Sequence, residues 1–336
     1  MPSGPILIVD DEPNNLAVMR QILKDDYPLV FANSGTSAVE AELKHRPSLI
    51  LLDIQMPDVD GLAVCRQLKA NPATESVPII FVSALTDVGD EAAGFTAGCV
   101  DYILKPVSVP IVRARVRTHL SLVRASELEK GHLAAISMLG EAGHYNDADT
   151  GVHIWRIAAF SGALAKAIGW PAKDVAMIEL AAPMHDTGKI GIPDAILRKP
   201  GPLDVTEWEV MKTHARIGYD ILSKSDAPLF RMAREIALSH HEKWDGSGYP
   251  SGLKGEEIPE SARIVALADV FDALSMKRPY KEAWSLDRVL ATIDQGAGSH
   301  FDPRLIEAFH RILPDILEIK ADYDAREETP MESQPL

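Results

Sequence analysis

The first 120 residues repeat one unit five times, and this repeat limits the fold more than any other feature of the chain. Each unit has a short apolar run, then a turn, then a helical pattern. The runs are PILIV (5–9), PLVFA (28–32), LILLD (49–53), PIIFVSA (78–84) and VDYIL (100–104). Short β-branched runs that alternate with helices are typical of a parallel sheet covered on both faces. Residues 1–120 are therefore predicted to form a doubly wound α/β domain with five parallel strands.

Polar side chains that could take part in phosphoryl chemistry lie at or just after the ends of several of these runs. They are Asp10, Asp11, Asp53, Ser83 and Lys105. In a doubly wound domain, ligands bind at the carboxyl ends of the strands. Converging carboxylates repel one another unless a hard cation such as Mg²⁺ lies between them, and a carboxylate can itself accept a phosphoryl group. Any one acid could be a solvated loop residue, but the recurrence of the pattern from strand to strand favours a phosphoryl site.

Over residues 5–119 the chain resembles the receiver domains of two-component response regulators. The resemblance rests on LLDIQMPDVDG (51–61), on the Lys-Pro pair at 105–106 and on the acids at the strand ends. It implies that Asp53 is the phosphoacceptor and that a cognate sensor histidine kinase is a partner. The other roles that it implies are a Mg²⁺ site with Asp53 (Asp10, Asp11), a switch pair (Ser83, Tyr102) and a phosphate-contacting lysine (Lys105).

A long helix is predicted after the fifth unit. No proline occurs between Pro110 and Pro171, and apolar residues recur at the helical interval within residues 111–141. The apolar stripe weakens beyond Ser126 and resumes at Leu133. We expect residues 121–143 to form a linker helix between two domains. The heptads are too few and too broken to decide whether it also forms a homodimeric coiled coil, and that alternative stays open.

Residues 144–321 have long amphipathic segments and few β-branched runs, so they are expected to form an all-helical domain. Histidines and acids gather in this region, and Asp149 and His153 are four residues apart, on one helix face. A lone helical histidine is more often a packed or surface residue than a ligand. The complete set is Asp149, His153, His185, Asp186, His214, His240, His241 and Asp269. One ion takes at most about six ligands, so these groups, if they converge, need two or more ions.

The ligand types narrow the choice of metal and of reaction. Imidazoles and carboxylates without thiolates suit iron, manganese, nickel, cobalt or zinc. Clustered divalent ions fit hydrolysis at phosphorus, because they lower the pKa of a bridging water and neutralise charge on the phosphoryl oxygens. Lys189, Arg278 and Lys281 are candidate cations for the substrate, although the last two could instead form a surface salt bridge. A formal net charge of −15 argues against nucleic acid as a partner.

Residues 144–320 resemble the HD-GYP branch of the HD phosphohydrolases. The resemblance rests on HDTGKIGIPD (185–194), HHEKWDGSGYP (240–250) and ALADVFDAL (266–274) with the RPYK that follows. It implies hydrolysis of cyclic di-GMP to pGpG, and in some members onward to GMP, with iron or manganese as the favoured metal. Proteins with diguanylate cyclase domains are implied as further partners.

The resemblance also implies roles for individual residues. His153, His185, Asp186 and Asp269 make up the core metal site, and Asp186 bridges to a second ion held by His214, His240 and His241. Asp186 and Lys189 are the catalytic residues, and the substrate contacts are Lys189, Arg278, Lys281 and, near a guanine base, Tyr249. Family members with three ions often carry glutamate where this chain has Asp149. Because aspartate is one methylene shorter, the choice between two and three ions stays open.

The leading hypothesis is therefore a response regulator in which phosphorylation of Asp53 controls a cyclic di-GMP phosphodiesterase. The sequence does not give the sign of that control. Two other functions stay open. The domain could be an adaptor that binds nucleotide or protein without turnover, or it could be an HD phosphohydrolase that acts on another nucleotide.

The remaining expectations concern the cell compartment and the C-terminus. No signal peptide fits the N-terminus, and no apolar run approaches the ~20 residues of a membrane span. The two cysteines, Cys65 and Cys99, form no close metal-binding pair and indicate a reducing compartment. We expect a cytoplasmic protein without membrane contact. The polar and acidic residues 322–336 are expected to form a disordered tail.

Overall fold

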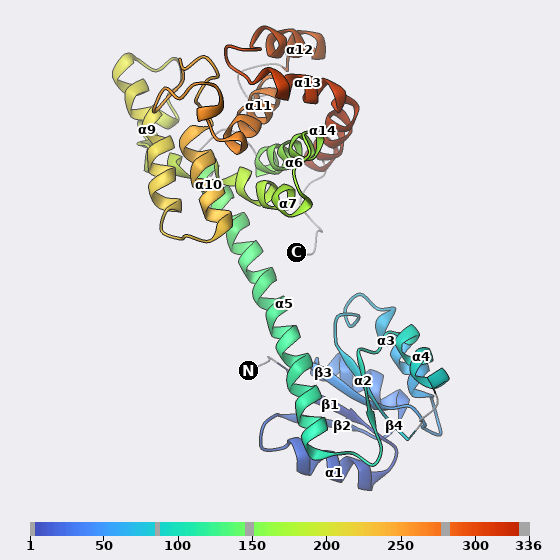
Figure 1. Ribbon diagram of the computed structural model, residues 1–336. Coiled ribbons are helices and arrows are strands. Elements are labelled where there is room, and N and C mark those ends of the chain that lie inside the picture. The colour runs from blue at the N-terminus through green and yellow to red at the C-terminus, as the bar shows by residue number, and fades with distance from the viewer. Residues whose placement is uncertain (1–3, 85–87, 145–150, 277–282, 329–336) are drawn as a thin grey trace. The chain divides into compact units, whose positions relative to one another are not determined.

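The computed structural model describes residues 4–84, 88–144, 151–276 and 283–328 (Figure 1). The chain divides into two compact units, Met1–His132 and Leu133–Leu336, which have separate hydrophobic cores. The helix α5 (Val109–His144) begins in the first unit and ends in the second. Within the described ranges, no helix has an apolar stretch sufficient to cross a bilayer.

The first unit contains a parallel five-stranded sheet with the strand order β2-β1-β3-β4-β5. The strands are β1 (Ile6–Val9), β2 (Leu29–Ala32), β3 (Leu49–Asp53), β4 (Ile79–Ser83) and β5 (Asp101–Leu104). They coincide with the five apolar runs, and the helices α1 (Pro13–Leu23), α2 (Gly35–His45), α3 (Gly61–Lys69) and α4 (Val88–Ala97) alternate with them. The prediction of a doubly wound receiver-like domain is confirmed.

The two faces of this sheet have separate apolar cores. Successive strand residues point to opposite faces. In β1, Leu7 and Val9 therefore belong to one core, while Ile6 and Ile8 belong to the other. Buried residues of α2 and α3 complete the first core, and buried residues of α1 and α5 complete the second. Coverage of both faces is the reason that these strands are apolar throughout instead of alternating.

Helix α5 is longer than the predicted linker of residues 121–143. Its first turns cover the sheet, because Val112, Val116 and Leu120 are buried in the second of these cores. The helix continues without interruption through Gly131 to His144. The prediction of a long helix is confirmed, and its first part also belongs to the core of the first unit.

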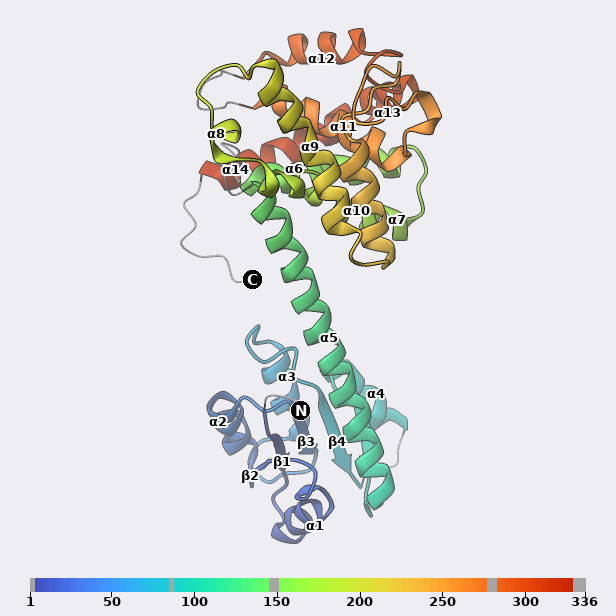
Figure 2. The same ribbon diagram turned by 90° about the vertical axis from the view of Figure 1, so that its left-hand side faces the viewer.

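The second unit is helical, as predicted. Its helices are α6 (Gly151–Ala167), α7 (Ala172–Ala181), α8 (Asp194–Leu197), α9 (Val205–Leu222), α10 (Pro228–Ser239), α11 (Glu260–Ser275), α12 (Leu286–Gln295), α13 (Pro303–Arg311) and α14 (Leu313–Glu328). Its described residues also form the 3₁₀ turns η1 (Ala182–Met184), η2 (Thr187–Gly191) and η3 (Gly255–Glu257). Phe271 of α11 lies at the centre, with ring centroids 5.4 Å from Phe160 and 5.1 Å from Phe309. Helices α9 and α10 lie side by side (Figure 2).

Helix α14 extends into the segment 322–336 that was expected to be a disordered tail. Helix α14 extends to Glu328, so the prediction is wrong for residues 322–328. Asp324 accepts a hydrogen bond from Lys320 at 2.5 Å and lies 3.9 Å from Nη1 of Arg156 on α6. These pairings stabilise an acidic segment whose composition alone indicates disorder. Residues 329–336 lie outside the described residues.

Candidate metal centres and phosphoryl site

The acids of the first unit meet at the carboxyl ends of β1 and β3, which are neighbours in the sheet. Asp10, Asp11 and Asp53 each offer an oxygen within 4.8 Å of the others. Lys105 follows β5 and places Nζ 2.9 Å from Asp10 and 2.7 Å from Asp53. Burial raises the pKa of Asp53, and the ammonium group of Lys105 only partly offsets this effect. Three convergent carboxylates with one adjacent cation fit a Mg²⁺ ion.

The expected switch residues lie on the two adjacent strands β4 and β5. Ser83 is buried at the end of β4, and Tyr102 is buried on β5. The Tyr102 ring lies 5.5 Å from both Phe81 and Phe95. A side chain at Gly94 would overlap the Tyr102 hydroxyl, so the glycine provides space for this ring position. The placement agrees with the expected pair, and the switch role itself stays a prediction.

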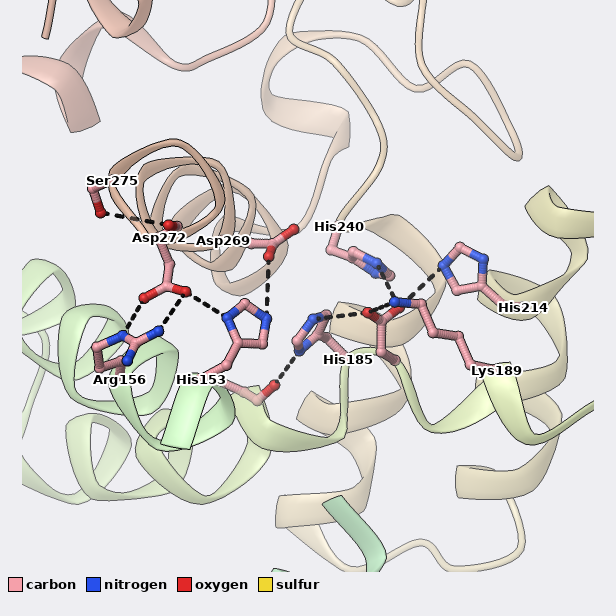
Figure 3. A network of polar contacts seen from close by, with 11 residues as sticks. His153, Arg156, His185, Lys189, His214, His240, Asp269, Asp272 and Ser275 are labelled. Atoms are coloured by element: carbon pink, nitrogen blue, oxygen red, sulfur yellow. Dashed lines mark hydrogen bonds and ion pairs between the residues drawn. The ribbon is translucent and has the colours of Figure 1, made fainter. Parts of the chain in front are cut away.

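Most of the expected ligands of the second unit converge in two adjacent groups (Figure 3). Each residue in a group offers a ligand atom within 4.8 Å of the others. One group is His153, His185 and Asp269, and the other is Asp186, His214, His240 and His241. His185 Nε2 lies 3.2 Å from Asp186 Oδ2, so the two groups are neighbours. The predicted ligand Asp149 and the predicted substrate contacts Arg278 and Lys281 lie outside the described residues.

Five separate segments bring these side chains together. His153 comes from α6, His185 and Asp186 from the junction of η1 and η2, His214 from α9, His240 and His241 from the end of α10, and Asp269 from α11. Close approach of η2 to α9 depends on Gly188, because a Cβ there would collide with the carbonyl oxygen of His214. The glycine of the HDTGK motif therefore determines how near His214 can come to Asp186.

Backbone carbonyls fix the orientation of three of the imidazoles. Nδ1 of His185, His214 and His240 lies 2.9 Å from Ala182 O, 2.7 Å from Met211 O and 3.1 Å from Ile236 O, respectively. A carbonyl oxygen can only accept, so Nδ1 carries the proton and Nε2 keeps its lone pair. Burial lowers the pKa of His214 to about 4, and burial also lowers the pKa of His185. His185 and His214 can therefore act as neutral ligands near neutral pH.

The Nε2 atoms face the carboxylate of Asp186. The distances to Asp186 Oδ1 are 3.3 Å from His214 and 3.6 Å from His240. Both Nε2 atoms are buried and have no hydrogen-bond partner among the described residues. Lone pairs that point at a carboxylate in a buried site repel it unless a cation lies between them. The arrangement fits a divalent ion bound by imidazole and carboxylate.

A buried ion pair that was not predicted from the sequence supports the predicted ligand His153. Asp272 Oδ2 accepts from His153 Nδ1 at 2.5 Å, and Asp272 Oδ1 accepts from Arg156 Nε at 2.5 Å. Burial acts to raise the pKa of Asp272, but hydrogen bonds from His153 and Arg156 outweigh this effect and lower it. Two spacings in the sequence could have indicated these contacts. Asp272 follows Asp269 by three residues, and Arg156 follows His153 by three, so each residue lies on the same helix face as a predicted ligand.

The Gly-Tyr-Pro loop lies next to the second ligand group. The Tyr249 ring stacks on His241, with centroids 4.7 Å apart and planes inclined by 28°. Glu242, buried beside His241, accepts hydrogen bonds from the backbone N–H groups of Ser251 at 2.7 Å and Leu253 at 3.1 Å. Glu242 therefore ties the loop to the end of α10, and it too was missed from sequence. The predicted substrate role of Tyr249 stays a prediction.

Two protein families match the chain. Residues 6–117 match the response regulator receiver domain, and residues 130–305 match the HD domain. A relative from Vibrio cholerae named probable cyclic di-GMP phosphodiesterase is 43% identical over 337 residues, 90% of this chain and 76% of the relative. The cyclic di-GMP phosphodiesterase response regulator RpfG of Xanthomonas campestris is 40% identical over 91% of this chain and 87% of its own length.

A shorter match covers about half of the chain. The 3'3'-cGAMP-specific phosphodiesterase 2 of Vibrio cholerae is 45% identical over 173 residues, 52% of this chain and 33% of that protein. Relatives named for two different cyclic dinucleotides are thus similar to this chain.

Proposed function

This chain belongs to the response regulators that join a receiver domain to an HD phosphodiesterase domain, and we propose that it hydrolyses cyclic di-GMP in a site centred on Asp186. One observation carries the proposal: the two ligand groups adjoin at His185 and Asp186. Carboxylates that serve two neighbouring ions are typical of sites that hydrolyse phosphate esters. The cyclic di-GMP specificity is supported by the names of the two long-matching relatives.

The residues of the site have distinct roles in this proposal. Divalent ions, when bound, supply an activated water and polarise the phosphodiester. Asp186 and the histidines of the two groups would hold the ions. Lys189, whose Nζ lies 2.7 Å from Asp186, contacts the phosphate and stabilises negative charge as it develops. Tyr249 faces the substrate beside the cluster.

The finer properties of the reaction are also proposed. The imidazole and carboxylate ligands suit iron, manganese, nickel, cobalt or zinc, and we assign iron or manganese from the resemblance to the HD-GYP branch. The product is pGpG, and hydrolysis onward to GMP depends on whether a third ion binds with Asp149. Arg278 and Lys281 complete the phosphate contacts. The phosphodiesterase domain comprises residues 144–321.

We further propose that a sensor histidine kinase phosphorylates Asp53 and that this changes the rate of hydrolysis. Support comes from the carboxylate cluster with Lys105 and from α5, which belongs to both units. Such control requires that the phosphorylated and unphosphorylated receiver interact differently with two states of the second unit.

Product analysis tests the proposal. Protein loaded anaerobically with iron or manganese is incubated with cyclic di-GMP, and the products are separated by chromatography. We expect pGpG, and we expect Asp186→Ala to abolish its formation, while Asp220→Ala, at an exposed aspartate of α9, leaves turnover unchanged. Binding of cyclic di-GMP without turnover under every metal favours an adaptor. Turnover of other nucleotides alone favours a different HD phosphohydrolase. Either result contradicts the proposal.

A further inference from the structure

Trp208 is a large aromatic residue on α9 that the structure leaves 45% exposed. A single exposed apolar side chain is common on protein surfaces and indicates nothing by itself. The surroundings of Trp208 are more informative than its exposure. The same helix carries the ligand His214, one and a half turns later along the chain.

Trp208 stands at the end of a row of rings that begins in the metal centre. Its ring lies 6.1 Å from Tyr249, edge to face at 81°. Tyr249 in turn stacks on His241 at 4.7 Å, and His241 belongs to the ligand group of Asp186. The flat surfaces next to the candidate ions are therefore continued outward by an indole that remains accessible to solvent.

A cation accompanies these rings. Lys212 follows Trp208 by one turn of α9, and its Nζ lies 5.9 Å from the centre of the Tyr249 ring. The same Nζ donates a hydrogen bond to Glu209 Oε1 at 2.8 Å, and Glu209 is largely exposed. Trp208, Tyr249 and Lys212 form what we call the aromatic rim. It combines flat apolar area with positive charge, which are the two properties that a nucleotide requires of a binding surface.

We propose that Trp208 and Lys212 extend the site into a subsite for one purine base of the cyclic dinucleotide, outside the metal ligands. This inference rests on the proposed function. The indole supplies a stacking surface, and Lys212 supplies charge for the adjoining phosphate. Stacking tolerates every base, because each base has a π face. The rim therefore contributes affinity without choosing between guanine and adenine.

Kinetics of rim variants test this subsite. Metal-loaded full-length protein carrying Trp208→Ala is assayed with cyclic di-GMP and with bis(2-hydroxyethyl) phosphate, an aliphatic diester without a base or any other aromatic ring. Loss of one stacked base is expected to raise KM for cyclic di-GMP roughly tenfold, within a range of about 5- to 150-fold, and to leave kcat nearly unchanged. KM for the base-free diester stays at its original value. Trp208→Phe restores most of the affinity.

Two controls and a second substrate accompany the test. Val205→Ala changes a more exposed apolar residue of the same helix, and Lys224→Ala changes an exposed lysine beyond its end, so neither alters KM. Lys212→Ala raises KM for the dinucleotide without an effect on the base-free diester. With 3'3'-cGAMP, where it is turned over, Trp208→Ala raises KM by the same factor as with cyclic di-GMP.

The outcomes separate the subsite from the proposed function. An unchanged KM for cyclic di-GMP in Trp208→Ala contradicts the subsite alone. An equal rise in KM for both diesters would mean that Trp208 only supports the position of Tyr249, and this result also contradicts the subsite. Wild-type protein that cleaves only the base-free diester contradicts the proposed function, and with it the subsite.

Discussion

Asp272 and His153 form a buried hydrogen bond of 2.5 Å between a carboxylate on α11 and Nδ1 of an imidazole on α6. The other ring nitrogen of His153 points towards Asp269, at 3.8 Å. Arg156 binds the same carboxylate and keeps it ionised. A carboxylate in this position fixes the tautomer of a ligand histidine and increases its basicity. The pair thus connects the packing of two helices to the affinity of the metal centre.

Replacement of Asp272 tests this connection. Asp272→Asn removes the charge but retains the shape, so His153 becomes a weaker and less well oriented ligand. We expect metal affinity to fall by about 10- to 100-fold, measured by competition with a chelator. The exposed pair of His310 and Asp294, at 2.6 Å, supplies the control, because Asp294→Asn removes a similar contact far from any ligand in sequence. Equal affinity in wild type and Asp272→Asn would contradict the role of Asp272.

Gly188 determines the distance between η2 and α9. Gly188→Ala introduces a Cβ that collides with the His214 carbonyl, so the segments must separate. We expect a loss of stability of about 1–3 kcal/mol, by analogy with overpacking, together with weaker metal binding. Denaturant unfolding and metal titration measure the two effects.

Gly131 is the matched control for that substitution. It lies in the exposed part of α5, and a Cβ there has no neighbour within 4 Å. Gly131→Ala should therefore stabilise the helix by about 0.5–1 kcal/mol, because alanine has the better helix propensity. If Gly188→Ala lowers neither stability nor metal affinity, like Gly131→Ala, then the close approach of η2 to α9 does not hold His214 in place.

Much of the fold could be predicted, because the signals are local. The five apolar runs predict the strands, since a parallel sheet buried on both faces requires continuous apolar residues. The motifs around His185 and His240 predict ligands, since their residue types have few other uses in such density. The resemblance to the HD-GYP branch implies that the groups converge, and the structure brings together every expected ligand that it describes.

The features that were missed depend on contacts between distant segments. Arg156 and Asp272 meet only because α6 packs on α11. Trp208 becomes a candidate substrate contact only because its ring lies next to Tyr249. The segment from residue 322 was predicted to be disordered from its acidic composition. Composition alone cannot predict its contact with Arg156, which lies 168 positions earlier in the chain than Asp324.

Asp302 makes stability dependent on pH. It is buried and accepts hydrogen bonds from Arg304 at 3.0 Å and Arg263 at 2.5 Å. Burial acts to raise the pKa of Asp302, but these hydrogen bonds outweigh it, so the pKa is lower than in the unfolded chain. The stability that this group contributes is therefore complete above the unfolded pKa of about 4 and is lost as the pH falls through the lower folded pKa.

Asp302→Asn should accordingly destabilise the protein most at neutral pH. We expect a loss of about 3 kcal/mol at pH 7, because Arg263 stays buried without its carboxylate. The difference from wild type should shrink as the pH falls below about 4, because the unfolded wild-type chain then binds a proton, and it should vanish once the folded carboxyl is protonated as well. Thermal unfolding of both proteins between pH 7 and about pH 3 measures this difference in stability. A difference that stays constant with pH would show that charge is not its cause.

The receiver site is tested by phosphorylation. With Mg²⁺ and a small acyl-phosphate donor, wild-type protein should gain one phosphoryl group, and Asp53→Asn should gain none, as measured by mass spectrometry of the intact protein. Asp25→Asn, at an exposed position after α1, serves as the control and should behave as wild type. Modification of Asp53→Asn to the wild-type extent would place the acceptor elsewhere.

The central claim is that His185 and Asp186 join two ligand groups into one multinuclear hydrolytic centre. Elemental analysis of anaerobically purified protein, run beside the product assay, tests it most directly. We expect two or more transition-metal ions per chain and formation of pGpG from cyclic di-GMP, with both lost in Asp186→Ala. A fully active protein that contains a single ion per chain, or a protein with two ions that releases no product, would contradict it.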